Sequence, residues 1–187
     1  QADLGSANIL VNNAGVSLVG SFAELSVEDF RWLFDINFWA VVTLTKALMP
    51  MLRAAHAAQV VNVSSIFGVI APPQHTAYVA SKFAIRGFSE SLRHELTGTS
   101  IGVTVVHPGG INTNISRNAR VGAGADRAQA AANRDAAQKP LRMPPERAAR
   151  IIVNGIRHRK KRVLVGVDAR ALELFQRTLP ASYWNVI

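Results

Sequence analysis

Four short apolar runs constrain the fold of this chain more than any other feature of its sequence. They occupy residues 9–11, 60–63, 103–106 and 163–165. Runs of this length are typical of strands that are buried on both faces of a parallel sheet. Segments of helical character separate them, so strands alternate with helices along the chain. The sequence therefore predicts an α/β fold, a doubly wound parallel sheet in three α/β/α layers.

Three helices are expected around these strands. The first begins at Ser26, a favourable N-cap followed by an acidic first turn. It runs toward Arg53, with an adjustment near Pro50. The second spans residues 78–96 and the third residues 145–156. Apolar residues cover more than one face of the first helix, so we expect it to pack against both the sheet and another subunit.

Composition excludes several classes of protein. The chain has 187 residues, 49% of them hydrophobic, which is enough for one α/β domain and too apolar for a disordered chain. It has no cysteine, which excludes disulfides and thiolate metal sites and agrees with a cytoplasmic protein. The sequence shows neither an apolar run of membrane-spanning length nor a signal peptide. Its five histidines lack metal-ligand spacing, so no metal site is expected.

The formal net charge of +9 can indicate a nucleic acid, an anionic membrane or an anionic cofactor as partner. The basic residues are spread along the chain without interleaved aromatic residues. A solvated basic surface with no nucleic-acid partner is therefore the favoured interpretation. The densest basic run, residues 157–162, falls between a predicted helix and a predicted strand and is expected to form a surface turn.

Residues 112–145 differ in composition from the rest of the chain. They are rich in Ala, Arg, Asn and Gln and poor in large apolar residues. The segment follows the third predicted strand, at the sheet edge where α/β proteins bind ligands. We therefore expect a substrate lid with one short helix around residues 125–137. A surface loop without this role is the alternative. Arg117 and Arg120 in the segment could instead meet an anionic substrate.

A tyrosine and a lysine in the second predicted helix carry the strongest chemical signal. Tyr78 and Lys82 are four residues apart and so lie on one face of the helix. A lysine ammonium beside a phenol favours the phenolate, which makes the phenol more useful for proton transfer. Ser65 follows the second predicted strand and can offer a hydroxyl to the same reacting oxygen. A core tyrosine and a surface lysine are the alternative interpretations.

Three further features surround this group. Asn37 lies in a hydrophobic helix, where its amide needs partners; it is either a structural residue or an anchor for a water near Lys82. Residues 12–15 end the first strand with small residues that let a ligand approach the backbone. Residues 108–113 end the third strand and could present backbone amides to a ligand.

In their order and spacing these motifs resemble the short-chain dehydrogenase/reductase family. Residues 12–15, Asn-Asn-Ala-Gly, are similar to its NNAG motif, and Pro108-Gly109 with Thr113 are similar to its PG motif. Its catalytic tetrad is matched by Asn37, Ser65, Tyr78 and Lys82. Five motifs in register make a chance match very improbable. The resemblance covers residues 9–165.

The resemblance implies a Rossmann-type fold that binds NAD or NADP and interconverts a secondary alcohol and a ketone or aldehyde. Tyr78 would exchange the proton with the substrate oxygen, and Ser65 would polarise the carbonyl. Lys82 would bind the nicotinamide ribose and lower the tyrosine pKa. Asn37 would hold a relay water. The other expected cofactor-binding residues are Asn12, Asn13, Ala14, Gly15, Pro108, Gly109, Ile111 and Thr113. The expected substrate-binding residues are Ser65, Phe67, His75 and Tyr78.

The apolar segment after Ser65, including Ile66, Val69 and Ile70, predicts a lipophilic small-molecule substrate. Family members also imply a homodimer or homotetramer paired through the helices that carry Asn37 and Tyr78. One departure is large, because the family's glycine-rich turn and first strands are not found before residue 9. We therefore expect residues 1–187 to form a single partial Rossmann-type domain without its N-terminal half. A non-catalytic fragment or assembly module is the alternative.

Overall fold

The computed structural model describes residues 6–126, 128, 131–132, 138 and 140–186. Its main sheet has four parallel strands in the order β1-β3-β4-β6. The strands are β1 (Ile9–Asn12), β3 (Ala58–Val63), β4 (Ile101–Pro108) and β6 (Arg162–Val165). All four coincide with the predicted apolar runs, so the predicted parallel α/β sheet is confirmed.

The register brings the carboxyl ends of the strands together at one edge of the sheet. Asn12 pairs with Asn62, and Val63 pairs with Val106. Pro108, at the end of β4, pairs with Val165 at the end of β6. Side chains and loops that follow these strands therefore meet at one edge, where open α/β sheets bind ligands.

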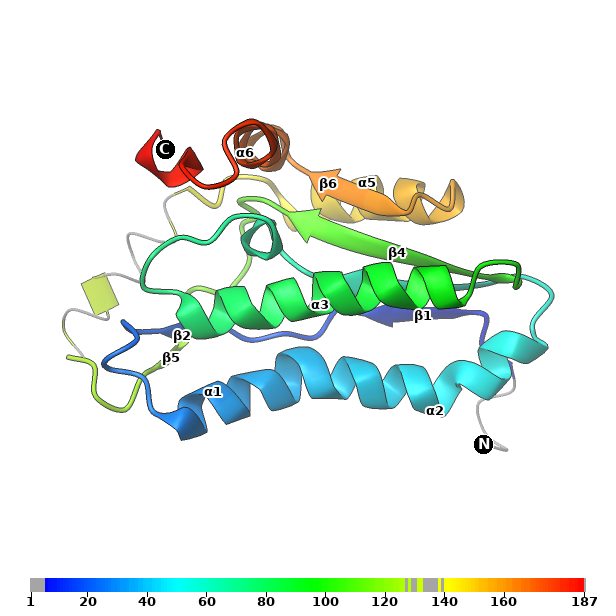
Figure 1. Cartoon of the computed structure of the whole chain (residues 1–187), viewed down its shortest axis with the longest axis horizontal. Coiled ribbons are helices and arrows are strands. Elements are labelled where there is room, and N and C mark those ends of the chain that lie inside the picture. Colours follow the sequence, from blue (N-terminus) through cyan, green and yellow to red (C-terminus); the bar gives the residue numbers. More distant parts are fainter. Residues whose placement is uncertain (1–5, 127, 129–130, 133–137, 139, 187) are drawn as a thin grey trace.

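Helices cover both faces of the sheet (Figure 1). On one face, α2 (Ala40–Ala54) and α3 (Thr76–Glu95) pack against the side of the sheet that carries Leu10, Val60 and Val103. On the other face, α5 (Pro145–Arg157) packs against the side that carries Val61, Val106 and Val163. Alternate residues of one strand thus enter two different cores, which explains why the strands are apolar throughout.

The first predicted helix contains a π-helical turn that was not expected. The Ser26 capping box starts α1 (Val27–Phe34), and a π-helical turn, η1 (Asp35–Trp39), leads into α2. Pro50 lies inside α2 without ending it, and the helix continues past Arg53 to Ala54, as expected. Pro50 stands in the last turns of the helix, where few intrahelical bonds follow it.

Several elements lie outside the sequence-based prediction. A second, two-stranded sheet pairs β2 (Leu18–Val19) with β5 (Arg120–Val121). Near the C-terminus are α6 (Val167–Thr178) and the short helix η3 (Tyr183–Asn185). Another short helix, η2 (Ile66–Gly68), follows β3. Most of the helix expected around residues 125–137 lies outside the described residues.

One surface feature was predicted from the sequence, and a second is seen in the structure. The basic run of residues 157–162 forms the turn between α5 and β6. β1 forms an edge of the sheet, where Ile9 and Val11 are about half exposed. Among the described helices, none is both long enough and apolar enough to cross a membrane.

Candidate active site

Tyr78 and Lys82 are buried together on α3. Tyr78 is 8% exposed and Lys82 is 4% exposed. Lys82 Nζ lies 5.6 Å from the centroid of the Tyr78 ring. The same ammonium donates a hydrogen bond of 3.3 Å to the carbonyl of Val63, at the end of β3. The helical spacing therefore places both side chains together, and the bond to Val63 places the Lys82 ammonium at the carboxyl edge of the sheet.

Burial shifts the two groups in opposite directions. It raises the pKa of Tyr78 to about 12, against an opposing effect of the Ser65 side chain. It lowers the pKa of Lys82 to about 8. Lys82 is not among the causes of the shift at Tyr78, so its expected effect on the tyrosine pKa stays a prediction. Loss of water penalises the charged form of each group, and at Tyr78 it outweighs the hydrogen bond with Ser65.

Ser65 is held at the turn that leaves β3. It is the N-cap of η2, and its Oγ accepts a hydrogen bond of 3.1 Å from the backbone N–H of Phe67. Its carbonyl accepts hydrogen bonds from Gly68 N and from His107 Nδ1, both at 2.9 Å. The turn thus fixes the hydroxyl close enough to Tyr78 to influence the tyrosine pKa.

The Asn37 amide has structural partners at both ends. Its Oδ1 accepts from Val16 N at 2.9 Å, and its Nδ2 donates to Val16 O at 3.0 Å and to Ser81 Oγ at 3.1 Å. Asn37 therefore joins η1 to the segment after β1 and to α3. The structural interpretation of this side chain is supported: both Nδ2 hydrogens are used, and Oδ1 accepts one of the two hydrogen bonds that it can accept.

The turn after β1 brings further candidates to the same place. A Cβ added at Gly15 would lie 3.3 Å from both Asn37 Oδ1 and Lys82 Nζ, so only a very small residue allows this close approach. Asn13 and Ala14 are exposed. Asn12 is instead directed into the core, where its Nδ2 donates to Asn62 Oδ1 at 2.8 Å. Its side chain supports the strand rather than facing a ligand.

The turn after β4 is bound by an acidic residue of α6 that sequence reasoning missed. The carboxylate of Asp168, in the first turn of α6, accepts a hydrogen bond of 2.6 Å from Gly110 N. Side chains at Gly109 or Gly110 would collide with this carboxylate or with the backbone of Pro140. Ile111 forms a bridge with Met143, and Thr113 is exposed beyond it. The only feature of the sequence that could have drawn attention to Asp168 is its position two residues after Gly166.

The predicted substrate residues divide into two groups. Phe67 packs edge-to-face against His75 and Tyr78, with centroids 5.3 Å and 6.0 Å apart. Phe67 therefore lies between His75 and the Tyr78 ring. In contrast, Ile66, Val69 and Ile70 are buried against Ala169 of α6. The expectation that this whole segment lines the pocket is therefore wrong, because α6 covers part of it.

Arg120 also differs from its expected role. Its guanidinium lies 3.1 Å from Asp29 Oδ1 and 4.8 Å from the centroid of the Trp32 ring. Both of these contacts tie β5 to α1, so this arginine is engaged within the protein rather than free for an anionic substrate. Among the described residues, no group of three or more His, Asp or Glu side chains could hold a metal ion.

Comparison with known proteins agrees with this geometry. Residues 1–123 match the short chain dehydrogenase family. The chain belongs to this family. It therefore comes from a group of oxidoreductases, and the parallel sheet with helices on both faces is the Rossmann-like fold of its structural neighbours.

Similar short-chain dehydrogenases include both bacterial and animal proteins. The oxidoreductase SadH of Mycobacterium tuberculosis is 39% identical over 188 residues, which cover 100% of this chain and 67% of that protein. Dehydrogenase/reductase SDR family member 7B of Xenopus laevis is 35% identical, over 98% of this chain and 55% of that protein. A Burkholderia phymatum short-chain dehydrogenase, solved in complex with NAD, has a TM-score of 0.83 at 26% identity, covering 95% of this chain and 67% of that one.

Proposed function

We propose that the protein interconverts a secondary alcohol and a ketone or aldehyde, with NAD or NADP as the hydride carrier. The observation that carries this proposal is the burial of Tyr78 and Lys82 on one face of α3, beside Ser65 and at the carboxyl edge of the sheet. Family membership supports a nicotinamide cofactor, since similar enzymes are solved with NAD or NADP.

The residues at this edge fit such a cofactor. Among the described residues, the Lys82 ammonium has one hydrogen-bond acceptor, the Val63 carbonyl at 3.3 Å, so two of its three donors can bind ribose hydroxyls. The small Gly15 lets a ligand approach the backbone beside it. Asn13, Ala14, Ile111 and Thr113 stand at the same edge, whereas Asn12 is used by the core.

Proton transfer then follows from the environment of Tyr78. Because burial raises its pKa to about 12, the phenol holds its proton at neutral pH and can donate it to a carbonyl oxygen during reduction. The tyrosinate that remains is stabilised by the nearby Lys82 ammonium. When bound, the nicotinamide supplies the hydride in reduction or accepts it in oxidation.

Two other residues assist in this scheme. The Ser65 hydroxyl donates a hydrogen bond to the substrate oxygen and favours the charge that develops on it. Asn37 would hold a relay water near Lys82, since its Oδ1 can accept a second hydrogen bond beside the one from Val16 N. The rings of Phe67 and His75 form an apolar wall beside Tyr78, which supports a lipophilic substrate.

The chain's two tyrosines provide a matched test. We expect Tyr78→Phe to lower kcat by about a hundredfold or more, because it removes the proton donor while keeping the ring. Tyr183→Phe makes the same chemical change at a hydroxyl that accepts a hydrogen bond from Ala71 N, and it should leave turnover unchanged. The assay follows reduced nicotinamide with a panel of secondary alcohols. Normal turnover by Tyr78→Phe would exclude this role.

A further inference from the structure

A fully buried histidine lies directly behind the proposed site. His107 is in β4 and is 0% exposed. Its Nδ1 lies 2.9 Å from the carbonyl oxygen of Ser65. A carbonyl oxygen can only accept a hydrogen bond, so Nδ1 must carry the hydrogen. The contact therefore selects one tautomer of the neutral ring, with a proton on Nδ1 and a bare lone pair on Nε2.

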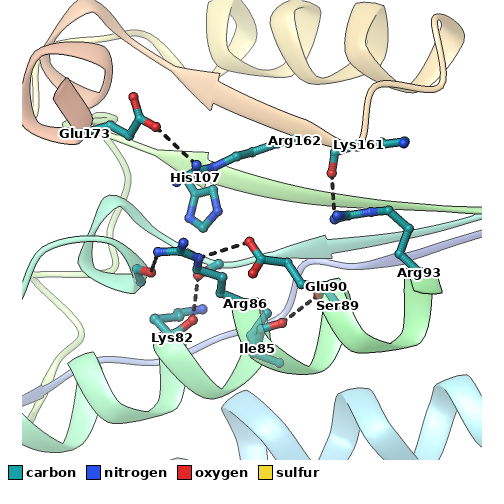
Figure 2. Close-up of polar contacts among 12 residues, drawn as sticks. Lys82, Ile85, Arg86, Ser89, Glu90, Arg93, His107, Lys161, Arg162 and Glu173 are labelled. Atoms are coloured by element: carbon teal, nitrogen blue, oxygen red, sulfur yellow. Dashed lines mark hydrogen bonds and ion pairs between the residues drawn. The ribbon is translucent and has the colours of Figure 1, made fainter. Parts of the chain in front are cut away.

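The groups around the ring favour the same state. Figure 2 shows His107 between Arg162 and Glu173 on one side and Arg86 and Glu90 on the other. Burial lowers the pKa of His107 to about 4. The bond to the Ser65 carbonyl and the charge of Glu90 oppose this shift, whereas the charges of Arg162 and Arg86 add to it. The ring therefore stays neutral across the physiological range of pH, and its Nδ1–H remains a neutral donor.

The arginine beside the ring has a matching feature. Within the described part of the chain, His107 Nε2 and Arg162 Nε are both buried without a hydrogen-bond partner. The first is an acceptor and the second is a donor. Glu173 holds the other end of the guanidinium at 3.2 Å. The positive charge of Arg162 lowers the pKa of His107, which disfavours a second proton on the ring.

The Ser65 carbonyl shows what this arrangement achieves. It accepts one hydrogen bond from Gly68 N, which closes η2, and a second from His107, so both of its lone pairs are used. The first bond is local, within the turn. The second is the one that ties the turn to a different strand, β4. A buried ring nitrogen without a hydrogen-bond partner lowers the stability of the fold. The bond from Nδ1 to the Ser65 carbonyl offsets part of this loss.

We propose that His107 is a positioning residue, whose Nδ1–H holds the Ser65 carbonyl and thereby keeps the Ser65 hydroxyl aimed at the substrate oxygen. This inference rests on the proposed function, because it assigns His107 a role through Ser65. The proposed role requires no contact between His107 and the substrate. A histidine that merely fills the core would affect stability but would not affect turnover through Ser65.

Three substitutions separate these roles in the intact protein. The amide nitrogen of His107→Asn can occupy the position of Nδ1, whereas that of His107→Gln corresponds to Nε2, and His107→Leu has no donor. We expect His107→Leu and His107→Gln to lower kcat roughly tenfold, since small misplacements of a catalytic group are costly. His107→Asn should retain kcat within about threefold. KM for the nicotinamide should not change in any of them.

A control variant accounts for lost stability. Gln59 donates a hydrogen bond of 2.7 Å to Thr104 between the same two strands, nearer to their amino ends. Gln59→Leu should lower the midpoint of thermal unfolding, as His107→Leu does, but leave kcat unchanged. Equal loss of kcat in Gln59→Leu, or equal kcat in His107→Asn and His107→Leu, would overturn the positioning role.

A double-mutant cycle tests whether the effect passes through Ser65. In a Ser65→Ala background, His107→Leu should cause no further loss of the residual kcat, because the hydroxyl that it positions is gone. The same loss in both backgrounds would overturn the inference while leaving the proposed function intact. If Ser65→Ala itself had no effect on turnover, the proposed role of Ser65 would fail, and the inference with it.

A spectroscopic measurement is independent of activity. Long-range ¹H–¹⁵N correlation spectra distinguish the two neutral tautomers of a histidine ring. We expect the His107 resonances, assigned with His107→Asn, to show hydrogen on Nδ1 and none on Nε2 at neutral pH. If the spectra showed the hydrogen on Nε2 and none on Nδ1, His107 could not donate to the Ser65 carbonyl, and the inference would be overturned.

Discussion

At the scale of single residues, burial controls the chemistry of the proposed site. Tyr78 and Lys82 would be unremarkable side chains in water, and each departs from its usual pKa because water is excluded from it. At neutral pH the tyrosine therefore keeps its proton and the lysine remains mostly an ammonium. Holding the Lys82 charge away from water reduces the stability of the fold.

This cost can be measured at Lys82. Its pKa falls from 10.5 to about 8, so between these values the unfolded chain binds more protons than the folded protein, and the stability of the fold rises with pH. A shift of this size corresponds to about 3 kcal/mol of destabilisation at neutral pH. We therefore expect Lys82→Met to raise the free energy of unfolding at pH ~7, by an amount that shrinks toward pH ~10.

Urea denaturation at the two pH values measures this difference. Lys46→Met provides the control, because Lys46 is an exposed lysine on α2 and its replacement should change stability little at either pH. If Lys82→Met raised the free energy of unfolding equally at both pH values, burial of the Lys82 ammonium would not be what destabilises the folded protein.

At the scale of elements, an ion pair anchors the first part of the segment expected to be a lid. Asp29 of α1 is buried and accepts a hydrogen bond of 3.1 Å from Ala123 N, in addition to its contact with Arg120. Burial opposes ionisation of Asp29, but the backbone bonds from Ala123 and Ser26, together with Arg120, outweigh it and lower its pKa. β5 is therefore fastened to α1, while the role of residues 112–145 as a lid remains a prediction.

Asp29→Asn tests this anchor. We expect it to lower the free energy of unfolding by about 1–3 kcal/mol and to speed amide hydrogen exchange in residues 118–124, because the buried bonds lose their charge. Since the Asp29 pKa is lowered, this stabilisation is present at neutral pH and is lost as the pH falls below its usual value. Mass-detected hydrogen exchange gives the local effect.

The neighbouring acid supplies a control. Glu28 pairs with Arg31 at 3.8 Å with both side chains largely exposed, so Glu28→Gln should change neither stability nor exchange measurably. If Asp29→Asn and Glu28→Gln behaved alike, the buried ion pair would have no anchoring role.

At the scale of the whole molecule, η1, α2 and α3 each carry a large apolar side chain that is exposed. Trp39, Leu44 and Phe83 are 54%, 49% and 38% exposed. Large apolar residues grouped on a helical surface are typical of protein interfaces. The expected pairing of subunits through the helices that carry Asn37 and Tyr78 stays a prediction, and these exposed side chains are where it can be tested.

Leu44→Glu tests this pairing. A charge at the centre of such an interface should convert the oligomer to a monomer, as measured by light scattering after size-exclusion chromatography. Val153→Glu makes the same change at a 45% exposed position on α5 and should leave the mass unchanged. A wild-type protein that is already monomeric at micromolar concentration would refute the pairing.

The sequence by itself determined the four strands, the three main helices and the spacing that puts Tyr78 and Lys82 on one face of α3. These features depend on local periodicity, which is written in neighbouring residues. Ser65 could be placed near them because parallel strands end at one edge. The family resemblance added roles that spacing alone did not supply.

Only the tertiary structure decided the rest. The π-turn at Asn37, the β2–β5 pairing, the Asp168 contact with Gly110 and the covering of Ile66 by α6 all join distant parts of the chain. The contact of His107 with Ser65 spans 42 residues. The opposite pKa shifts of Tyr78 and Lys82 likewise depend on how much water the folded chain excludes. No local pattern carries this information, because it arises from which neighbours the fold brings together.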